Sequence, residues 1–409
     1  MTTPSAPLPR SVLGRHRLLA PTAGVHVSPL CLGGMNFGDA WSSIMGECSK
    51  ETAFEILDYF YEMGGNFIDT ANNYQAEQSE MWIGEWLALH GPYRRDEMVL
   101  ATKYSSAYKV FSEPHLQQSN FGANSTKSLV LSVEASLKKL RTTYIDLLYV
   151  HYWDFTTGVE EMMQSLNQLV QSGKVLYLGI SDTPAWIVAK ANAYARHHGL
   201  RPFSVYQGRW SAAQRDFERD IIPMCRDEGM GLAPWGALGG GYFKPSSSQP
   251  TTEQQGGGGG GRNMAAVTTG KEAQVSRVLE KVANARKPAV PLTSIALAYV
   301  MHKSPYVTPI VGGRKLSHLR QNIEALTIRL TPAEIDEIES AYPFDVGFPM
   351  NFINGNNPKA AIRGPEDIAL TKRLGHFDFV QGSQPILPPL GVEKLSEAER
   401  AEVLGYRLS

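Results

Sequence analysis

Short apolar runs alternate with stretches whose apolar residues recur at helical spacing along most of the chain. The runs NFID, MVLATK, IDLLYVH, VLYLGIS, FSVYQ, GLAPW and TPIVG are typical of strands. Helices are predicted near residues 49–63, 79–89, 125–140, 159–171, 184–198, 217–228, 271–285, 293–301 and 317–325. Counting the strand before Gly33, the series contains eight strand–helix units, and alternation of this length implies parallel strands.

Eight units of this size favour an α/β fold of the closed (β/α)8 TIM-barrel type over an open sheet. The strands are mostly continuous apolar runs, as expected when both faces of a parallel strand are covered. A doubly wound sheet is the alternative, but its usual G-x-G-x-x-G is absent after the first strand, which ends in LGGMNFG. Before that strand, LLAP and VHVSPLCLG flank a Thr-Ala-Gly turn and predict an N-terminal β-hairpin.

The repeating pattern ends near residue 342, which divides the chain into a barrel, 1–342, and a C-terminal extension, 343–409. We expect this loop and tail to lie against the outside of the barrel or across one mouth, with short helices near 366–373 and 396–403. Residues 245–270 are rich in Ser, Gln and Gly, and the run Gly256–Gly261 satisfies any glycine pattern. This composition predicts a flexible insert within the barrel.

Composition narrows the possible partners and compartment. The formal net charge of −1 gives no electrostatic footprint for nucleic acid or an anionic membrane. Neither a signal-peptide order nor an apolar run long enough to cross a bilayer is present, so a cytoplasmic protein is expected. We also expect a monomer or homodimer. Three widely spaced cysteines favour reduced thiols over a disulfide framework or a zinc site; they are Cys31, Cys48 and Cys225. Asn124 begins a glycosylation acceptor by letter only.

Four ionisable residues lie at or just beyond the ends of predicted strands. Asp69 and Tyr74 belong to NFIDTANNY, Lys103 ends MVLATK, and His151 ends IDLLYVH. In a (β/α)8 barrel the C-terminal ends of the strands carry the chemistry. These residue types together supply a proton donor, a cation that tunes it, an anion that holds the cation, and a hydrogen-bond donor for a carbonyl oxygen. The set indicates reduction of an aldehyde or ketone.

Each of the four residues taken singly also has an ordinary structural interpretation. A loop tyrosine, a solvated cation, a turn aspartate and a hydrogen-bonded core histidine are all common. Their joint occurrence on strand ends favours catalysis, with Tyr74 as the general acid. Because an unperturbed phenol has a pKa of about 10, we expect Lys103 to lower the pKa of Tyr74. Asp69 would hold Lys103, and His151 would donate to the carbonyl oxygen as negative charge develops.

The segments FIDTANNY, VLATK and YVHYWD resemble those that carry the same four residues in the aldo-keto reductases, and the match spans roughly residues 18–342 in order. Within that family GECSK, GGNFIDTANNY, YIDLLYVHYWDFTT, KVLYLGISDTPAW and PFDVGFPM are most similar to fungal aryl-alcohol dehydrogenases and norsolorinic acid reductase-like proteins. The resemblance implies a soluble barrel oxidoreductase whose catalytic residues are Asp69, Tyr74, Lys103 and His151.

Protein side chains cannot deliver a hydride, so a cofactor must supply it. The resemblance implies NADP(H), because Arg314 and Lys315 are placed for a 2′-phosphate. By the family pattern, the cofactor-binding residues are Met35, Asp69, Ser181, Asp182, Gln207, Trp235, Gly236, Ala237, Leu238, Gly239, Lys244, Arg262, Gly312, Arg314, Lys315, His318, Gln321 and Asn322. Some letters depart from the commoner ones: Asp182 replaces Asn, Gly236-Ala237 replaces Ser-Pro, and His318 and Gln321 replace Gln and Glu.

Aromatic residues in loops on the same face are expected to line an apolar substrate pocket; they are Trp41, Tyr104, Trp153, Trp210 and Phe348. Together with these residues, the resemblance implies an NADPH-dependent reductase of aromatic aldehydes or ketones, reversible toward aryl alcohols, in fungal polyketide secondary metabolism. A non-enzymatic, NADP(H)-sensing regulatory subunit on the same fold is the alternative. A metal-dependent barrel hydrolase or lyase would need a carboxylate and histidine cluster at the strand ends, which the sequence lacks.

Overall fold

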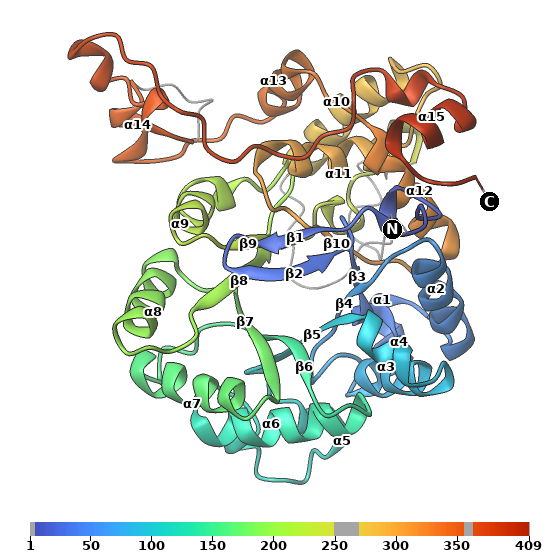
Figure 1. The fold of residues 1–409 in the computed structure, drawn as a ribbon, viewed down its shortest axis with the longest axis vertical. Coiled ribbons are helices and arrows are strands. Elements are labelled where there is room, and N and C mark those ends of the chain that lie inside the picture. The colour runs from blue at the N-terminus through green and yellow to red at the C-terminus, as the bar shows by residue number, and fades with distance from the viewer. Residues whose placement is uncertain (1–4, 249–269, 356–362, 409) are drawn as a thin grey trace, which may run out of the picture.

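Eight parallel strands form a nearly closed barrel in the computed structural model, which describes residues 5–248, 270–355 and 363–408 (Figure 1). The order around the ring is β10-β3-β4-β5-β6-β7-β8-β9. The strands are β3 (Cys31–Gly33), β4 (Phe67–Asp69), β5 (Val99–Tyr104), β6 (Ile145–Val150), β7 (Val175–Ser181), β8 (Phe203–Arg209), β9 (Gly231–Trp235) and β10 (Ile310–Val311). A parallel bridge from Leu232 to Val307 lies beside the junction of β9 with β10. The predicted TIM barrel is confirmed.

Helices surround the barrel, and each begins within a few residues of its predicted position. They are α2 (Lys50–Glu62), α3 (Gln78–Leu89), α6 (Thr126–Lys139), α7 (Val159–Gln171), α8 (Ala185–His197), α9 (Ile221–Asp227), α10 (Lys271–Asn284), α11 (Leu292–Lys303) and α12 (Leu316–Glu324). The hydroxyl of Ser49 accepts from the amide of Thr52, so Ser49 is the N-cap of α2. All residues of β5 and β6 are buried, as two covered faces require.

The N-terminal hairpin closes one end of the barrel. Its strands, β1 (Arg17–Ala20) and β2 (Ala23–Val27), pair antiparallel and lie across the ring in Figure 1. Leu19 and Val27 of the hairpin pack with Phe67 and Val99, which begin their strands, in a cluster inside the barrel. Because apolar side chains fill this N-terminal end, the open, C-terminal end is left for ligands.

Several short helices were not predicted from the sequence. They are α1 (Ser42–Met45), α4 (Pro92–Glu97), α5 (Lys109–Ser112), α13 (Pro332–Ser340) and α14 (Met350–Ile353). The signal for α13 is present in the sequence, because Thr331 and Glu334 form a capping box and Pro332 occupies the first helical position. In the tail, α15 (Glu397–Leu404) matches its prediction.

The other helix predicted in the tail, near 366–373, is wrong. Two 3-10 turns, Pro365–Asp367 and Thr371–Arg373, occupy that stretch. The amide of Ala369, between them, donates 3.0 Å to the carbonyl of Ile353 in α14. This pairing with another segment replaces the local bond that a continuous α-helix would make.

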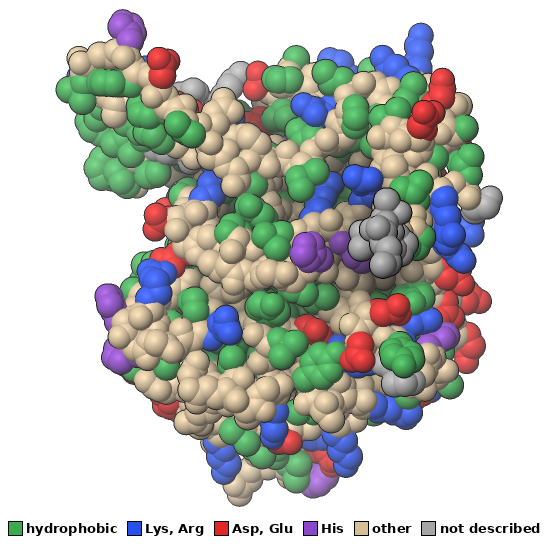
Figure 2. Space-filling view, in the orientation of Figure 1, with side chains coloured by type: hydrophobic (Ala, Val, Ile, Leu, Met, Phe, Trp, Pro, Cys, Tyr) green, Lys and Arg blue, Asp and Glu red, His purple; other side chains and the backbone are tan. Residues whose placement is uncertain are grey.

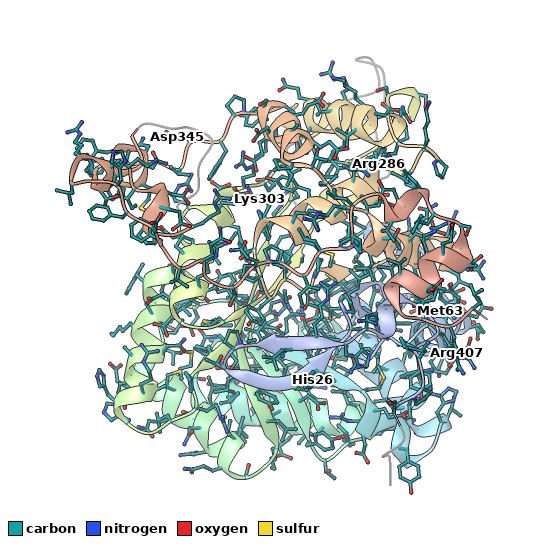
Figure 3. All side chains as sticks on the ribbon, turned by 45° about the horizontal axis from the view of Figure 1, so that its top comes forward. His26, Met63, Arg286, Lys303, Asp345 and Arg407 are labelled. Atoms are coloured by element: carbon teal, nitrogen blue, oxygen red, sulfur yellow. The ribbon has the colours of Figure 1, made fainter. Side chains whose placement is uncertain are left out.

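The C-terminal extension follows the outside of the barrel. Arg219 donates 3.0 Å to the carbonyl of Val346, Arg286 pairs with Glu393 at 3.0 Å, and the amide of Arg407 donates 2.9 Å to the carbonyl of Pro9. Figure 3 labels Arg286 and Arg407. Part of the extension projects from the body and carries exposed hydrophobic side chains, which appear at the upper left of Figure 2. The domain division at residue 342 stays a prediction, and the predicted insert lies mostly outside the described residues.

The structure also bears on the membrane-span, cysteine and glycosylation expectations. In the described part of the chain no helix combines the length and apolar character that crossing a bilayer requires. Cys31, Cys48 and Cys225 are buried and form no disulfide, as predicted. Asn124 is fully buried, and its amide nitrogen donates to Ser105 and to a backbone carbonyl, so the side chain is not accessible for glycosylation in this fold.

Candidate active site

Asp69, Tyr74, Lys103 and His151 converge at the open end of the barrel. The Lys103 ammonium lies 2.5 Å from the Asp69 carboxylate, 2.7 Å from the Thr70 carbonyl and 3.2 Å from the Tyr74 hydroxyl. The rings of Tyr74 and His151 meet edge to face, with centroids 5.8 Å apart. A phenol, an ammonium, a carboxylate and an imidazole from three neighbouring strands therefore surround one spot.

Strand alternation places the ammonium inside the barrel. Along β5, Val99 and Ala101 belong to the inner cluster, whereas Leu100 and Tyr104 pack in the outer cluster against the helices. Lys103 therefore shares the inward face. The Lys103 side chain is fully buried, and Asp69 supplies the counter-charge that such burial requires. The second Asp69 oxygen accepts from the Gln207 amide at 2.8 Å, which fixes the carboxylate.

Burial controls the protonation of the catalytic candidates. Burial raises the pKa of Tyr74 above its ordinary value, and the Lys103 charge opposes that rise without cancelling it. Lys103 therefore acts on this pKa in the expected direction, but the pKa is raised overall and not lowered, because the loss of hydration around the phenolate form has the larger effect. Burial acts to lower the pKa of Lys103, yet Asp69 and Tyr74 outweigh it and the pKa is raised. At neutral pH the phenol keeps its proton and the amine stays charged.

His151 is held in its neutral form. Burial, reinforced by the Lys103 charge, lowers the pKa of His151 to about 3. The Nδ1 atom lies 3.3 Å from the Ser106 hydroxyl, which leaves Nε2 as the nitrogen for a second partner. A neutral imidazole donates one hydrogen bond and does not compete with Tyr74 as an acid.

The structure supports one of the aromatic residues predicted for the substrate pocket and contradicts two others. Trp41 contacts the Tyr74 ring, with centroids 6.4 Å apart. The prediction is wrong for Tyr104 and Trp210, because both side chains are fully buried and cannot line an open pocket. The Tyr104 hydroxyl donates to the Asn124 carbonyl, and the Trp210 nitrogen donates to Glu218. Tyr104 follows inward-facing Lys103 on its strand and must point the other way.

The remaining two predicted pocket residues are not brought to the four catalytic candidates. Trp153 is 9% exposed and contacts the exposed Phe155, while Phe348 is 82% exposed on the projecting extension, where its ring contacts Phe352. Two aromatic residues that the sequence did not single out contact His151 or Trp41. Phe111 contacts Trp41 with centroids 5.9 Å apart, and Tyr152 contacts His151 at the same distance.

The comparisons with known proteins agree with this geometry. The Aldo/keto reductase family matches residues 29–343. This chain belongs to the aldo-keto reductase family. It is 57% identical, over 91% of its length and 94% of the relative's, to norsolorinic acid reductase B of Dothistroma septosporum. It is 55% identical to aryl-alcohol dehydrogenase GME11368 of Pestalotiopsis microspora (94% and 96% covered), and 48% identical to aryl-alcohol dehydrogenase [NADP(+)] of Phanerodontia chrysosporium (94% and 98% covered).

In this aldo-keto reductase, the residues expected to hold the nicotinamide lie on consecutive strand ends. Ser181 ends β7, Gln207 lies near the end of β8, and Trp235 ends β9. The Asp182 carboxylate accepts from the Ser181 hydroxyl at 3.3 Å. Trp235 is 37% exposed, and the Arg209 guanidinium lies 6.0 Å from the centroid of its ring.

The predicted pyrophosphate segment follows Trp235 directly. Gly236 and Gly239 have φ of +75° and +73°, a conformation that favours glycine. Ala237 and Leu238, between them, are buried and half-buried. Lys244 is half-buried farther along, and Arg262 lies outside the described residues.

The predicted adenine end lies between β10 and α12. Gly312, Lys315 and Asn322 line one small pocket there. Arg314 and Lys315 are exposed just before α12, and the Arg314 guanidinium packs over Gly46, where a Cβ would lie 1.4 Å from its nitrogen. His318 and Gln321 are exposed on the first turns of α12, and Met35 lies half-buried after β3. A helix start beside two cations fits a phosphate-bearing nucleotide.

Proposed function

We propose that this aldo-keto reductase reduces aromatic aldehydes or ketones with NADPH and oxidises aryl alcohols in the reverse direction. The contact of Lys103 with both Asp69 and Tyr74, beside a neutral His151, carries the proposal. Relatives named as norsolorinic acid reductase and as NADP(+)-dependent aryl-alcohol dehydrogenase support the substrate class and the cofactor. We extend the proposal to a cytoplasmic enzyme, monomeric or homodimeric, of fungal polyketide secondary metabolism.

The bound cofactor supplies a hydride to the carbonyl carbon. The π electrons of the carbonyl pass to its oxygen, which takes the proton of the Tyr74 hydroxyl. Lys103 stabilises the phenolate left behind, and Asp69 keeps Lys103 charged and in place. His151 donates from Nε2 to the same oxygen as negative charge develops. A phenol with a raised pKa remains protonated at neutral pH and is ready to donate.

The proposed cofactor contacts extend from this centre along the mouth of the barrel. Ser181, Asp182 and Gln207 would hold the carboxamide, and Trp235 would stack on the nicotinamide. Gly236 to Gly239 would follow the pyrophosphate, with Lys244 and Arg262 as charge partners. The remaining proposed contacts are Met35, Gly312, Arg314, Lys315, His318, Gln321 and Asn322. Two exposed cations at the start of α12 support NADP(H) over NAD(H).

Tyr74→Phe tests the proposal, because it removes the proton donor and keeps the ring. Turnover of an aryl aldehyde should fall by about 10²–10⁴-fold, while NADPH binding measured by fluorescence stays near that of the wild type. Tyr104→Phe is the matched control, since that buried hydroxyl donates to a backbone carbonyl on the outer side of β5 and its loss should leave turnover intact.

Two results would contradict the proposal. Wild-type turnover in Tyr74→Phe would remove Tyr74 as the acid. Tight NADPH binding by the wild-type protein, without consumption across a panel of aryl aldehydes, would favour a cofactor-sensing regulatory subunit on the same fold.

A further inference from the structure

The turn that follows Tyr74 has an unusual backbone. Gln75, Ala76 and Glu77 have φ of +52°, +50° and +79°, so three consecutive residues other than glycine occupy the left-handed region. Glycine adopts these angles without a steric penalty, whereas side chains with a Cβ are strained there. Such strain persists only where surrounding contacts impose it, and it concentrates at functional sites. We call residues 75–77 the latch turn.

The first side chain of the latch turn holds the loop after β3. Gln75 is fully buried; its Oε1 accepts from the Trp41 amide at 2.7 Å, and its Nε2 donates to the Met35 carbonyl at 3.0 Å. These two bonds reach both sides of the loop that carries Trp41. Glycine at position 75 would relieve the backbone strain, but it would also remove both hydrogen bonds between Gln75 and the loop.

The third side chain of the latch turn holds the long loop after β5. Glu77 is 5% exposed, and its Oε1 accepts from the Lys109 ammonium at 2.9 Å and from the Ser112 hydroxyl at 2.6 Å. Both partners belong to the α5 turn, which also carries Phe111. The other Glu77 oxygen lies 3.0 Å from Lys139 of α6, which anchors the carboxylate to the helix layer.

The two loops held in this way present aromatic rings that meet above the catalytic tyrosine. The Trp41 ring contacts Tyr74 on one side, at 6.4 Å, and Phe111 on the other, at 5.9 Å. Phe111 is 61% exposed, so its ring is accessible to a ligand. A flat aromatic carbonyl compound can stack or pack edge to face on this wall while its carbonyl oxygen reaches Tyr74.

We infer that Gln75 and Glu77 are positioning residues that set the preference for aromatic substrates, by fixing Trp41 and Phe111 over Tyr74. This inference rests on the proposed carbonyl reduction. Glycine at position 75 or 77 could not make these side-chain contacts.

The test compares three single variants: Gln75→Gly, Glu77→Gly and Ala76→Gly. The last is the matched control, since it makes the same backbone change at the intervening position without removing a long side chain. With NADPH, kcat/KM is measured for 2-naphthaldehyde and for propanal. The ratio of the two should fall by about tenfold in Gln75→Gly and Glu77→Gly, because an aromatic contact contributes roughly that factor, and should stay near the wild-type ratio in Ala76→Gly. Displacement of Tyr74 alone would slow both aldehydes by the same factor.

Amide hydrogen exchange gives a second readout that needs no turnover. Gln75→Gly should speed exchange in residues 36–45, Glu77→Gly should speed it in residues 105–113, and Ala76→Gly should change neither. An unchanged specificity ratio with unchanged exchange in both loops would overturn the inference. If the wild-type protein reduces neither aldehyde, the proposed function fails, and the exchange pattern alone decides whether the latch turn holds the two loops.

Discussion

Two buried groups of charges in this protein contain similar residue types and do different things. One surrounds Lys103 at the open end of the barrel. The other joins the segment after β8 to α11 and α13; its members are Arg215, Glu218, Tyr299, Lys303 and Glu339, and we call it the structural cluster. Each contains a lysine, at least one carboxylate and a tyrosine, so burial and charge alone do not separate them.

The difference lies in which polar atoms remain open. In the structural cluster, one Glu218 oxygen accepts from Trp210, Arg215 and Tyr299, and the other contacts Arg215 and Lys303. Around Lys103, the buried charges support Tyr74 and His151, and both of these side chains stay partly exposed at the mouth. A fully paired cluster fixes helices to the barrel, whereas a buried ion pair that supports open donors can act on a ligand.

Exchanging the two lysines for methionine gives the largest expected contrast. Lys103→Met should lower turnover of an aryl aldehyde by at least about a hundredfold, because the phenolate loses its stabilising charge. Lys303→Met should leave turnover per folded molecule unchanged, because Lys303 contacts the structural cluster and not the site. Steady-state kinetics normalised to folded protein distinguishes the two variants. Equal losses of turnover in both would contradict the different roles of Lys103 and Lys303.

Removing the central cation of the structural cluster should affect stability instead. Arg215 is 4% exposed and bonds both Glu218 and Glu339, so Arg215→Met leaves two buried carboxylates short of a partner. The free energy of unfolding should fall by about 3–5 kcal/mol, as measured by urea denaturation. A decrease in the free energy of unfolding below about 1 kcal/mol would show that the ion pairs of Arg215 contribute no more than ordinary surface ion pairs.

Removing the Tyr299 hydroxyl from the structural cluster should have a smaller effect on stability. The Tyr299 hydroxyl lies 3.3 Å from Glu218 and 3.1 Å from Glu339, and both carboxylates keep other partners when it is removed. Tyr299→Phe should therefore cost about 1 kcal/mol of unfolding free energy. A loss as large as that of Arg215→Met would show that the hydroxyl, and not the guanidinium, organises the cluster.

A further prediction concerns pH. The pKa of His151 is lowered from 6.5 to about 3, so between these two values the unfolded chain binds a proton at His151 that the folded protein does not. Stability should therefore fall as pH is lowered through that window, and His151→Gln should reduce this dependence. The kcat/KM profile should lack an inflection near pH 6.5 from this histidine; such an inflection, lost in His151→Gln, would contradict a neutral imidazole.

Much of the fold and of this site could be predicted from the sequence because the signals are local. Asp69 ends β4, Lys103 lies near the end of β5, and His151 directly follows β6. Each of these strands is a short apolar run that is visible in the sequence, and a parallel barrel brings the ends of such runs together. The convergence of the three side chains therefore follows once the order of strands and helices is known.

The aromatic wall of the site was predicted less well. The prediction failed for Tyr104, although its place beside inward-facing Lys103 already fixed its outward direction. Phe111 could not be found from the sequence, since its position depends on contacts between Glu77 and the α5 turn, 32 and 35 residues apart along the chain. Loop geometry of this kind is set by tertiary contacts and has no local pattern.

The electrostatics were harder to predict than the geometry. The sequence showed that a lysine would lie near Tyr74, but the direction of the pKa shift depends on how completely the phenol is withdrawn from water. Burial of that kind arises from residues in many segments, so no local pattern encodes it.

Isotope transfer from the nicotinamide shows whether these four side chains assist hydride transfer to a carbonyl carbon. The protein is incubated with an aryl aldehyde and NADPH that carries deuterium at the transferable C4 position of the nicotinamide, and the alcohol is analysed by mass spectrometry and NMR. With the wild-type protein we expect one deuterium on the carbinol carbon. The rate of alcohol formation should fall at least about a hundredfold in Tyr74→Phe. Alcohol formed without deuterium, or formed equally fast by Tyr74→Phe, would contradict it.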